Sequence, residues 1–179
     1  GMTKSPSVKD NAQKAVDYLV SLQKSNGFWK HTRKNKPEIF TTMQAVVALK
    51  TAKSAGLSIS NSYELVSAGI SRLRTDTAHG YFGYALNGNR PDPKASMYGI
   101  LTQIFTGYSA EQLNQIKTGG RWSSNILNNA LYEMDVDYIL AGTLSMFQMG
   151  GDLWKNWNQG MKKPLLNKQI RGGLDNGAW

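Results

Sequence analysis

The sequence contains no cysteine and only two histidines among its 179 residues. The absence of cysteine excludes a disulfide scaffold, thiolate zinc sites and cysteine nucleophiles. The histidines, His31 and His79, lie in loop-like stretches without a second ligand at metal spacing, so we expect no metal site and no cofactor. The glycine and serine patterns of nucleotide-binding loops and hydrolases are absent as well.

Long apolar runs are also absent. No stretch reaches about eighteen uninterrupted apolar residues, and the first ten residues hold no signal-peptide core. We therefore expect a soluble protein without a membrane span, and a cytoplasmic one if Met2 is the native start. Gly1 resembles a remnant of tag removal.

Acidic residues are few compared with basic ones: 12 Asp and Glu stand against 21 Lys and Arg, giving a net charge of +9. The excess lies in residues 1–60, mostly around the run from Lys30 to Lys36. This run has no interleaved aromatic residues. We interpret it as a solvated loop rather than a phosphate-binding or acid-binding patch, and we expect no nucleic-acid partner.

What the sequence does contain is a repeat. A glycine, any residue and a large aromatic residue occur at Gly27–Trp29, Gly80–Phe82, Gly120–Trp122 and Gly177–Trp179. Each of the first three is followed by a segment of mostly small and apolar residues, which is typical of a buried helix. A helix with one apolar stripe precedes the first, at residues 11–25. The unit is thus an amphipathic helix, a turn and a buried helix.

The buried helices align on a small residue, Ala45, Gly99 or Gly142. Ser109 and Gln112 form a capping-box pattern that predicts a further helix start. We expect outer helices at 11–25, 62–75 and 156–170, and inner helices at 41–54, 95–106 and 137–149.

The predicted fold is all-α, with about seven helices in helical hairpin repeats. A tail at 1–10 precedes one repeat domain at 11–179. Its units span about 11–56, 60–107, 109–151 and 152–179, and the last is incomplete.

The residues of this repeat resemble those of the α/α-toroid proteins, the fold of squalene-hopene cyclases, other class II terpene cyclases and protein prenyltransferase β subunits. Gln23 before Gly27–Trp29, and Gln169 before Gly177–Trp179, are similar to the QW motif of the prenyltransferase/squalene-oxidase repeat family. The segments "GYFGYALNGNRPDPKAS" and "GTLSMFQMGGDLWKNWNQGMKKPLLNKQ" are similar to further parts of its units.

This resemblance implies a partial, open toroid. Prenyltransferases hold zinc with Asp, Cys and His, so the lack of cysteine puts that activity out of reach. In the family a buried helix follows each glycine-aromatic turn, so we expect the chain to stop inside a unit.

One acidic cluster, "EMDVDY", precedes the third buried helix. Class II cyclases start carbocation chemistry with Asp-x-Asp-Asp at such a helix start, and Asp135, Asp137 and Tyr138 fall on that pattern with tyrosine in the last place. By this match Asp137 is the acid and Asp135 its helper. The alternative, which we favour, is that these aspartates cap the helix and offset its dipole.

Tyr84, Tyr98 and Tyr138 flank the starts of buried helices, where the resemblance places the opening of the pocket, and we predict that they line the concave surface. Arg90 and Asp92 are interpreted as turn residues, with an anion-binding Arg90 as the alternative. The other large aromatic residues are predicted to pack between units. They are Trp29, Phe82, Trp122, Trp154, Trp157 and Trp179.

Two functions compete at this stage. The favoured one is a non-catalytic module that binds an apolar, isoprenoid-like ligand or a partner peptide on its concave face; the other is an acid-initiated isoprenoid cyclase or isomerase that uses Asp137. We also predict self-association, or a partner, at the C-terminal edge near Leu165, Leu166, Ile170 and Trp179, because an uncapped terminal repeat leaves apolar surface exposed.

Overall fold

The computed structural model describes residues 6–30, 38–76, 79–84 and 90–179. In this part of the chain the secondary structure is helical apart from one short hairpin of two strands, β1 (Arg74–Asp76) and β2 (Tyr81–Phe82). The all-α prediction is therefore confirmed.

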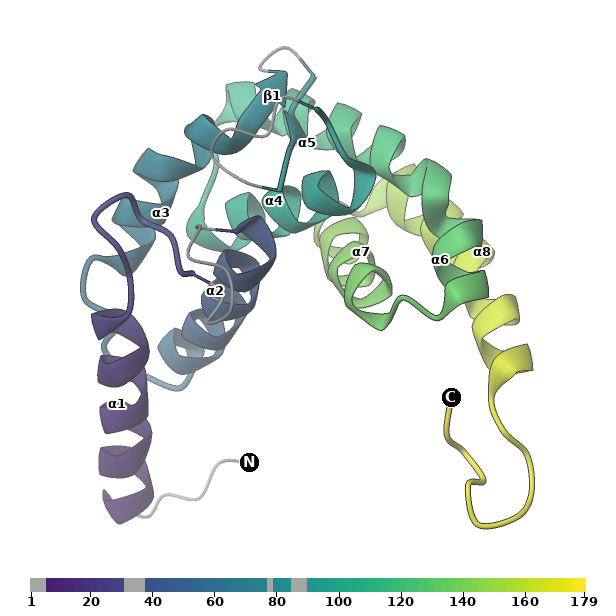
Figure 1. Ribbon diagram of the computed structural model, residues 1–179, viewed down its shortest axis with the longest axis horizontal. Coiled ribbons are helices and arrows are strands. Elements are labelled where there is room, and N and C mark those ends of the chain that lie inside the picture. Colours follow the sequence, from purple (N-terminus) through teal and green to yellow (C-terminus); the bar gives the residue numbers. More distant parts are fainter. Residues whose placement is uncertain (1–5, 31–37, 77–78, 85–89) are drawn as a thin grey trace.

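The helices form an arch with an inner and an outer row (Figure 1). The inner row lies along the concave side and consists of α2 (Ile39–Ser54), α4 (Pro93–Thr106) and α7 (Val136–Met149). The helices outside them are α1 (Pro6–Ser21), α3 (Ser62–Ile70), α5 (Ala110–Ser123), α6 (Leu127–Glu133) and α8 (Gly151–Lys168). Helix α4 is central, since it contacts both α2 and α7.

The helix boundaries depart from the prediction at several ends. Helix α1 begins at Pro6, so the predicted tail at 1–10 is too long; proline suits the first turn of a helix because its missing N–H would have no partner there. Helix α3 ends at Ile70 instead of 75, because Arg74 enters the strand pair opposite Phe82. Helix α8 begins at Gly151, before the expected residue 156.

The third glycine-aromatic motif is not a turn. Helix α5 continues through Gly120–Trp122 to Ser123, and the short helix α6 follows. The Trp122 ring stacks on Tyr81 at 4.3 Å between centroids. The start of α5 does follow the prediction, because Ser109 and Gln112 form both hydrogen bonds of the capping box.

Two of the small residues of the inner helices lie directly under aromatic rings. A Cβ atom on Gly99 would lie 2.6 Å from the Phe82 ring, and one on Gly142 would lie 2.2 Å from the Trp157 ring. Phe82 belongs to the glycine-aromatic motif of its own unit, whereas Trp157 comes from α8. The Gly142 contact joins α7 of the inner row to α8 of the outer row, and the Gly99 contact joins α4 to β2.

The N-terminal glycine-aromatic turn is held by side chains on both sides. Gln23 Nε2 donates to Gly27 O at 2.9 Å and to Ser62 O of α3 at 3.0 Å. The Trp29 indole donates to Leu19 O at 2.8 Å, and its ring is buried. Gly27 has φ +90°, and a Cβ there would collide with the backbone of α3, so only glycine fits.

The C-terminal turn repeats this geometry without the neighbouring helix. Gln169 Nε2 donates to Gly177 O at 2.9 Å, the Trp179 indole donates to Leu165 O at 2.8 Å, and Gly177 has φ +92°. Here Trp179 is 55% exposed. The two turns share these contacts although only one of them packs against a neighbouring helix. Their structure is therefore determined by residues of the turn and of the helix before it.

Candidate functional site

The first turns of the three inner helices meet around a cleft of about 390 Å³. Two residues at or near the start of each helix line the cleft. They are Glu38 and Phe40 at α2, Lys94 and Tyr98 at α4, and Asp135 and Asp137 at α7. Three of the predicted site residues, Tyr98, Asp135 and Asp137, are thus brought together by helices far apart in sequence.

Tyr84, which follows β2, completes the lining. Its backbone carbonyl accepts a hydrogen bond from Ile39 N at 3.1 Å, and its hydroxyl is hydrogen-bonded to Asp92. The Tyr84 and Tyr98 centroids are 6.5 Å apart, and those of Tyr98 and Phe40 are 5.2 Å apart. The three rings therefore form one continuous aromatic wall.

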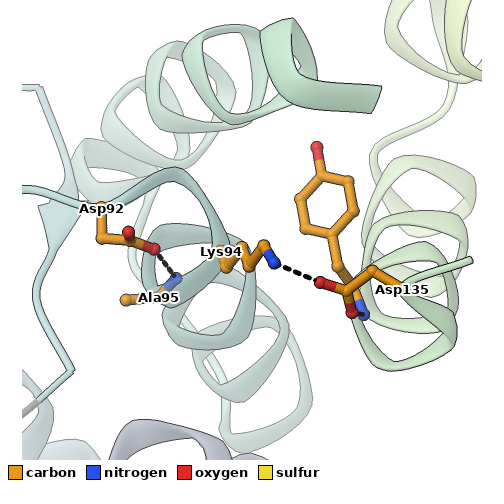
Figure 2. A network of polar contacts seen from close by, with 5 residues as sticks. Asp92, Lys94, Ala95 and Asp135 are labelled. Atoms are coloured by element: carbon orange, nitrogen blue, oxygen red, sulfur yellow. Dashed lines mark hydrogen bonds and ion pairs between the residues drawn. The ribbon is translucent and has the colours of Figure 1, made fainter. Parts of the chain in front are cut away.

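Asp135 is a capping residue tied to α4 (Figure 2). One carboxylate oxygen accepts from Tyr138 N at 3.1 Å, and the other lies 2.5 Å from Lys94 Nζ. This hydrogen bond to Asp135 is the main cause of the raised pKa of Lys94. Asp92 caps α4 in the same way, by accepting from Ala95 N at 2.9 Å. The capping interpretation of Asp135 is therefore confirmed.

Asp137 lies in the first turn of α7, and its side chain is exposed on the cleft. Among the described residues it has no ion-pair partner and no hydrogen bond to Asp135. Both Asp135 oxygens already have other partners. The arrangement thus leaves Asp137 as an open carboxylate and gives no direct contact for a helper role of Asp135.

The tyrosines of the cleft remain protonated at neutral pH. Burial raises the pKa of Tyr98, and the negative charges of Asp135 and Asp137 raise it further. Burial, the charge of Asp92 and the hydrogen bond to Asp92 raise the pKa of Tyr84. Both hydroxyls are therefore neutral groups, and their rings present an uncharged face to a ligand.

The remaining predicted residues lie elsewhere. Tyr138, expected on the concave surface, is fully buried: its hydroxyl donates to Ser123 O, and its centroid is 5.8 Å from that of Trp157. It follows Asp137 directly, and the helical rotation of one residue turns it away from the cleft. Arg90 is exposed and does not line the cleft.

The predicted packing aromatics divide into three groups by their exposure. Trp29, Phe82 and Trp157 are buried, as predicted, and Trp122 and Trp154 are half-buried. Trp179 is largely exposed.

Phe40, Lys94 and Glu38 are site residues that the sequence did not indicate. Each lies at or just before the first turn of an inner helix, as the predicted residues Asp135 and Asp137 do. That shared position is the signal that would have found them.

No group of three or more metal-ligating side chains occurs in the described ranges. His79 stacks on Tyr81 at 5.5 Å, whereas His31 and all of the basic run after Lys30 lie outside the described residues. None of the helices in the part of the chain that the structure describes is both long and apolar enough to cross a membrane. No protein-family model, curated protein or solved structure matches the chain.

Proposed function

We propose that the chain is an arc of an α/α toroid that binds, without catalysis, an apolar ligand or a partner peptide on its concave face. The observation that supports this most directly is the cleft where three inner helices meet, walled by Phe40, Tyr84 and Tyr98. Ligand sites in proteins are typically concave and lined by aromatic side chains with a few polar groups.

Helix α7, whose first turn lines the cleft, also exposes apolar side chains along its length. Val136, Leu140 and Phe147 are each about three-fifths exposed, although the helix belongs to the inner row. Large apolar side chains that are exposed together on one helix are typical of a surface that binds a ligand or a partner. A ligand that covers this face would bury them.

Binding of farnesol, a neutral isoprenoid probe, tests this proposal. We expect Leu140→Asp and Phe147→Asp each to weaken binding at least about tenfold, since each replaces an apolar contact by a charge. Tyr132→Asp, at an exposed aromatic residue of α6 in the outer row, is the control and should leave the affinity unchanged. Equal affinities in all four proteins would refute binding at this face.

An acid-initiated isoprenoid cyclase is the second candidate, favoured by one observation: the open Asp137 carboxylate lies in the same cleft as the aromatic wall. Product formed from squalene or a prenyl diphosphate, and lost in Asp137→Asn, would decide for it. We favour the binding module because both oxygens of Asp135 already have partners, Lys94 Nζ and Tyr138 N, so Asp137 has no second carboxyl in direct contact.

A further inference from the structure

We infer that the cleft at the starts of α2, α4 and α7 selects ligands with a substituted ammonium group, which would sit against Phe40 and Tyr98 and beside the Asp137 carboxylate. This inference rests on the proposed binding function and specifies the chemistry of its ligand. It follows from the combination of rings and charge in one cavity.

The aromatic wall supplies the first part of the site. Phe40 and Tyr98 meet at 51° and Tyr98 and Tyr84 at 65°, so the rings are inclined to one another and form a concave corner. Ring faces carry negative partial charge and attract a cation within about 6 Å of the centroid, most strongly when water is excluded. Substituted ammonium groups are recognised by such corners because their methyl groups also favour apolar contact.

The charge balance of the cleft supplies the second part. Asp92 and Asp135 are engaged as helix caps, and Lys94 pairs with Asp135, so these charges largely satisfy one another. Asp137 is different, because its carboxylate faces the cleft with no ion-pair partner among the described residues. It is available as the counter-ion of a bound cation.

The size and the polarity of the cleft agree with this ligand. A volume of about 390 Å³ holds a trimethylammonium group together with an attached chain. The tyrosine hydroxyls are neutral at physiological pH, because burial and the nearby carboxylates raise the pKa of Tyr84 and of Tyr98. The cleft also holds the carboxylates of Glu38 and Asp135, of which Asp135 is paired with Lys94. Since the rings form much of the wall and no group of three metal-ligating side chains occurs among the described residues, the cleft favours an organic cation over a small hydrated metal ion.

Choline and its neutral isostere 3,3-dimethylbutan-1-ol provide the decisive comparison, because they have nearly the same shape and differ in charge. We expect choline to bind at least about tenfold more tightly, as measured by ligand-observed NMR with the full chain. Acetylated trimethyllysine amide, titrated in parallel, distinguishes the sources: tighter binding of it than of choline identifies a modified side chain of a partner protein, and the reverse a small metabolite.

Three variants locate the site. Asp137→Asn removes the charge and Phe40→Leu removes one ring, and each should weaken choline binding at least about fivefold while binding of the isostere changes little after Asp137→Asn. Asp152→Asn is the matched control, since Asp152 also lies in the first turn of a helix but outside the cleft. Circular dichroism verifies that each variant is folded.

Several outcomes would overturn the inference. Equal binding of choline and the isostere, both weakened by Phe40→Leu, would leave the proposed function standing and remove the cation. Choline binding that Asp137→Asn and Phe40→Leu leave unchanged would place the cation elsewhere. A lack of choline binding up to tens of millimolar, in a protein that binds farnesol, would also refute the inference.

Discussion

At the scale of single residues, two buried tyrosines differ in whether their hydroxyl forms a hydrogen bond. The Tyr138 hydroxyl donates to Ser123 O, whereas the buried Tyr63 hydroxyl has no hydrogen-bond partner among the described residues. An unpaired buried hydroxyl costs free energy that a phenyl ring does not, because its contact with water is lost without replacement.

We therefore expect opposite effects from two identical substitutions. Tyr63→Phe should keep or raise the free energy of unfolding, by up to about 1 kcal/mol, and it retains the ring that lies 5.4 Å from Lys53 Nζ. Tyr138→Phe should lower it by about 1 kcal/mol, since it removes a hydrogen bond and leaves the Ser123 carbonyl unpaired. Urea denaturation at neutral pH measures both. A larger loss in Tyr63→Phe than in Tyr138→Phe would contradict this assignment.

The same tyrosines predict a loss of stability in alkali. Burial raises the pKa of Tyr63 to about 12 and raises those of Tyr98 and Tyr138 as well. Their contribution to stability is constant below the unfolded pKa near 10 and falls as the pH rises from there towards the folded pKa, because the unfolded chain loses the proton first. The slope is about 1.4 kcal/mol per pH unit for each such tyrosine.

Denaturation midpoints measured between neutral pH and pH about 11 test this. The double variant Tyr63→Phe/Tyr138→Phe should lose less stability across this range than the wild type, because phenylalanine does not ionise. Parallel curves for the two proteins would show that these side chains do not titrate differently in the folded and unfolded states.

At the scale of helices, the packing of α7 depends on the absence of a side chain at one position. Gly142→Ala would place a Cβ about 2.2 Å from the Trp157 ring, so that the ring or the helix must shift. We expect a loss of roughly 1–3 kcal/mol in the free energy of unfolding, the usual cost of overpacking a core.

Gly160→Ala in α8 is the control, since its Cβ would meet only the flexible end of Leu127 at 3.2 Å. It should be neutral or stabilising by up to about 1 kcal/mol, because alanine favours a helix interior more than glycine does. If both variants lose the same stability, the ring contact at Gly142 is not the cause.

The inner and outer helices were largely predictable, because their apolar periodicity and their capping residues are local. The break between α6 and α7 was not, since Met134 ends α6 in the left-handed region at φ 54°, where glycine or asparagine would have been the sequence signal. Gly120 was the opposite case, because a turn was predicted there and α5 continues through it. A glycine is tolerated inside a helix at a modest cost in free energy.

Several residues of the candidate site were predictable, but the contacts between residues of different helices were not. The resemblance to the toroid family indicated Asp135 and Asp137, through the acid motif, and Tyr84 and Tyr98, through their places near the starts of buried helices. The sequence could not show that Lys94 would pair with Asp135, because that contact joins α4 to α7 across 41 positions and depends on how the inner helices pack. Phe40 was missed for the same reason, since its ring contact is with Tyr98 on another helix.

At the scale of the whole molecule, the arch has apolar side chains exposed at both ends. On α8 and the turn that follows it, the exposed residues are Leu166, Ile170, Leu174 and Trp179. At the other end they are Val8 and Tyr18 of α1 and Leu22 just after it. A groove of about 500 Å³ lies beside Leu166 on α8. The equivalent turn at the other end of the arch is covered by α3, which shows that this local structure accepts a packed helix.

We therefore predict that copies of the chain associate through the C-terminal edge. Apolar groups that are exposed together favour contact with another surface, and Leu166 is the apolar residue that lines the groove. Leu166→Lys should weaken the association, because it places a charge in the contact.

Tyr108→Lys is the control, since Tyr108 is 43% exposed against 42% for Leu166 and lies between α4 and α5. In sedimentation velocity at micromolar concentrations we expect the wild type and Tyr108→Lys to show a mass that rises with concentration and Leu166→Lys to remain monomeric; a wild type that is monomeric throughout would disprove it.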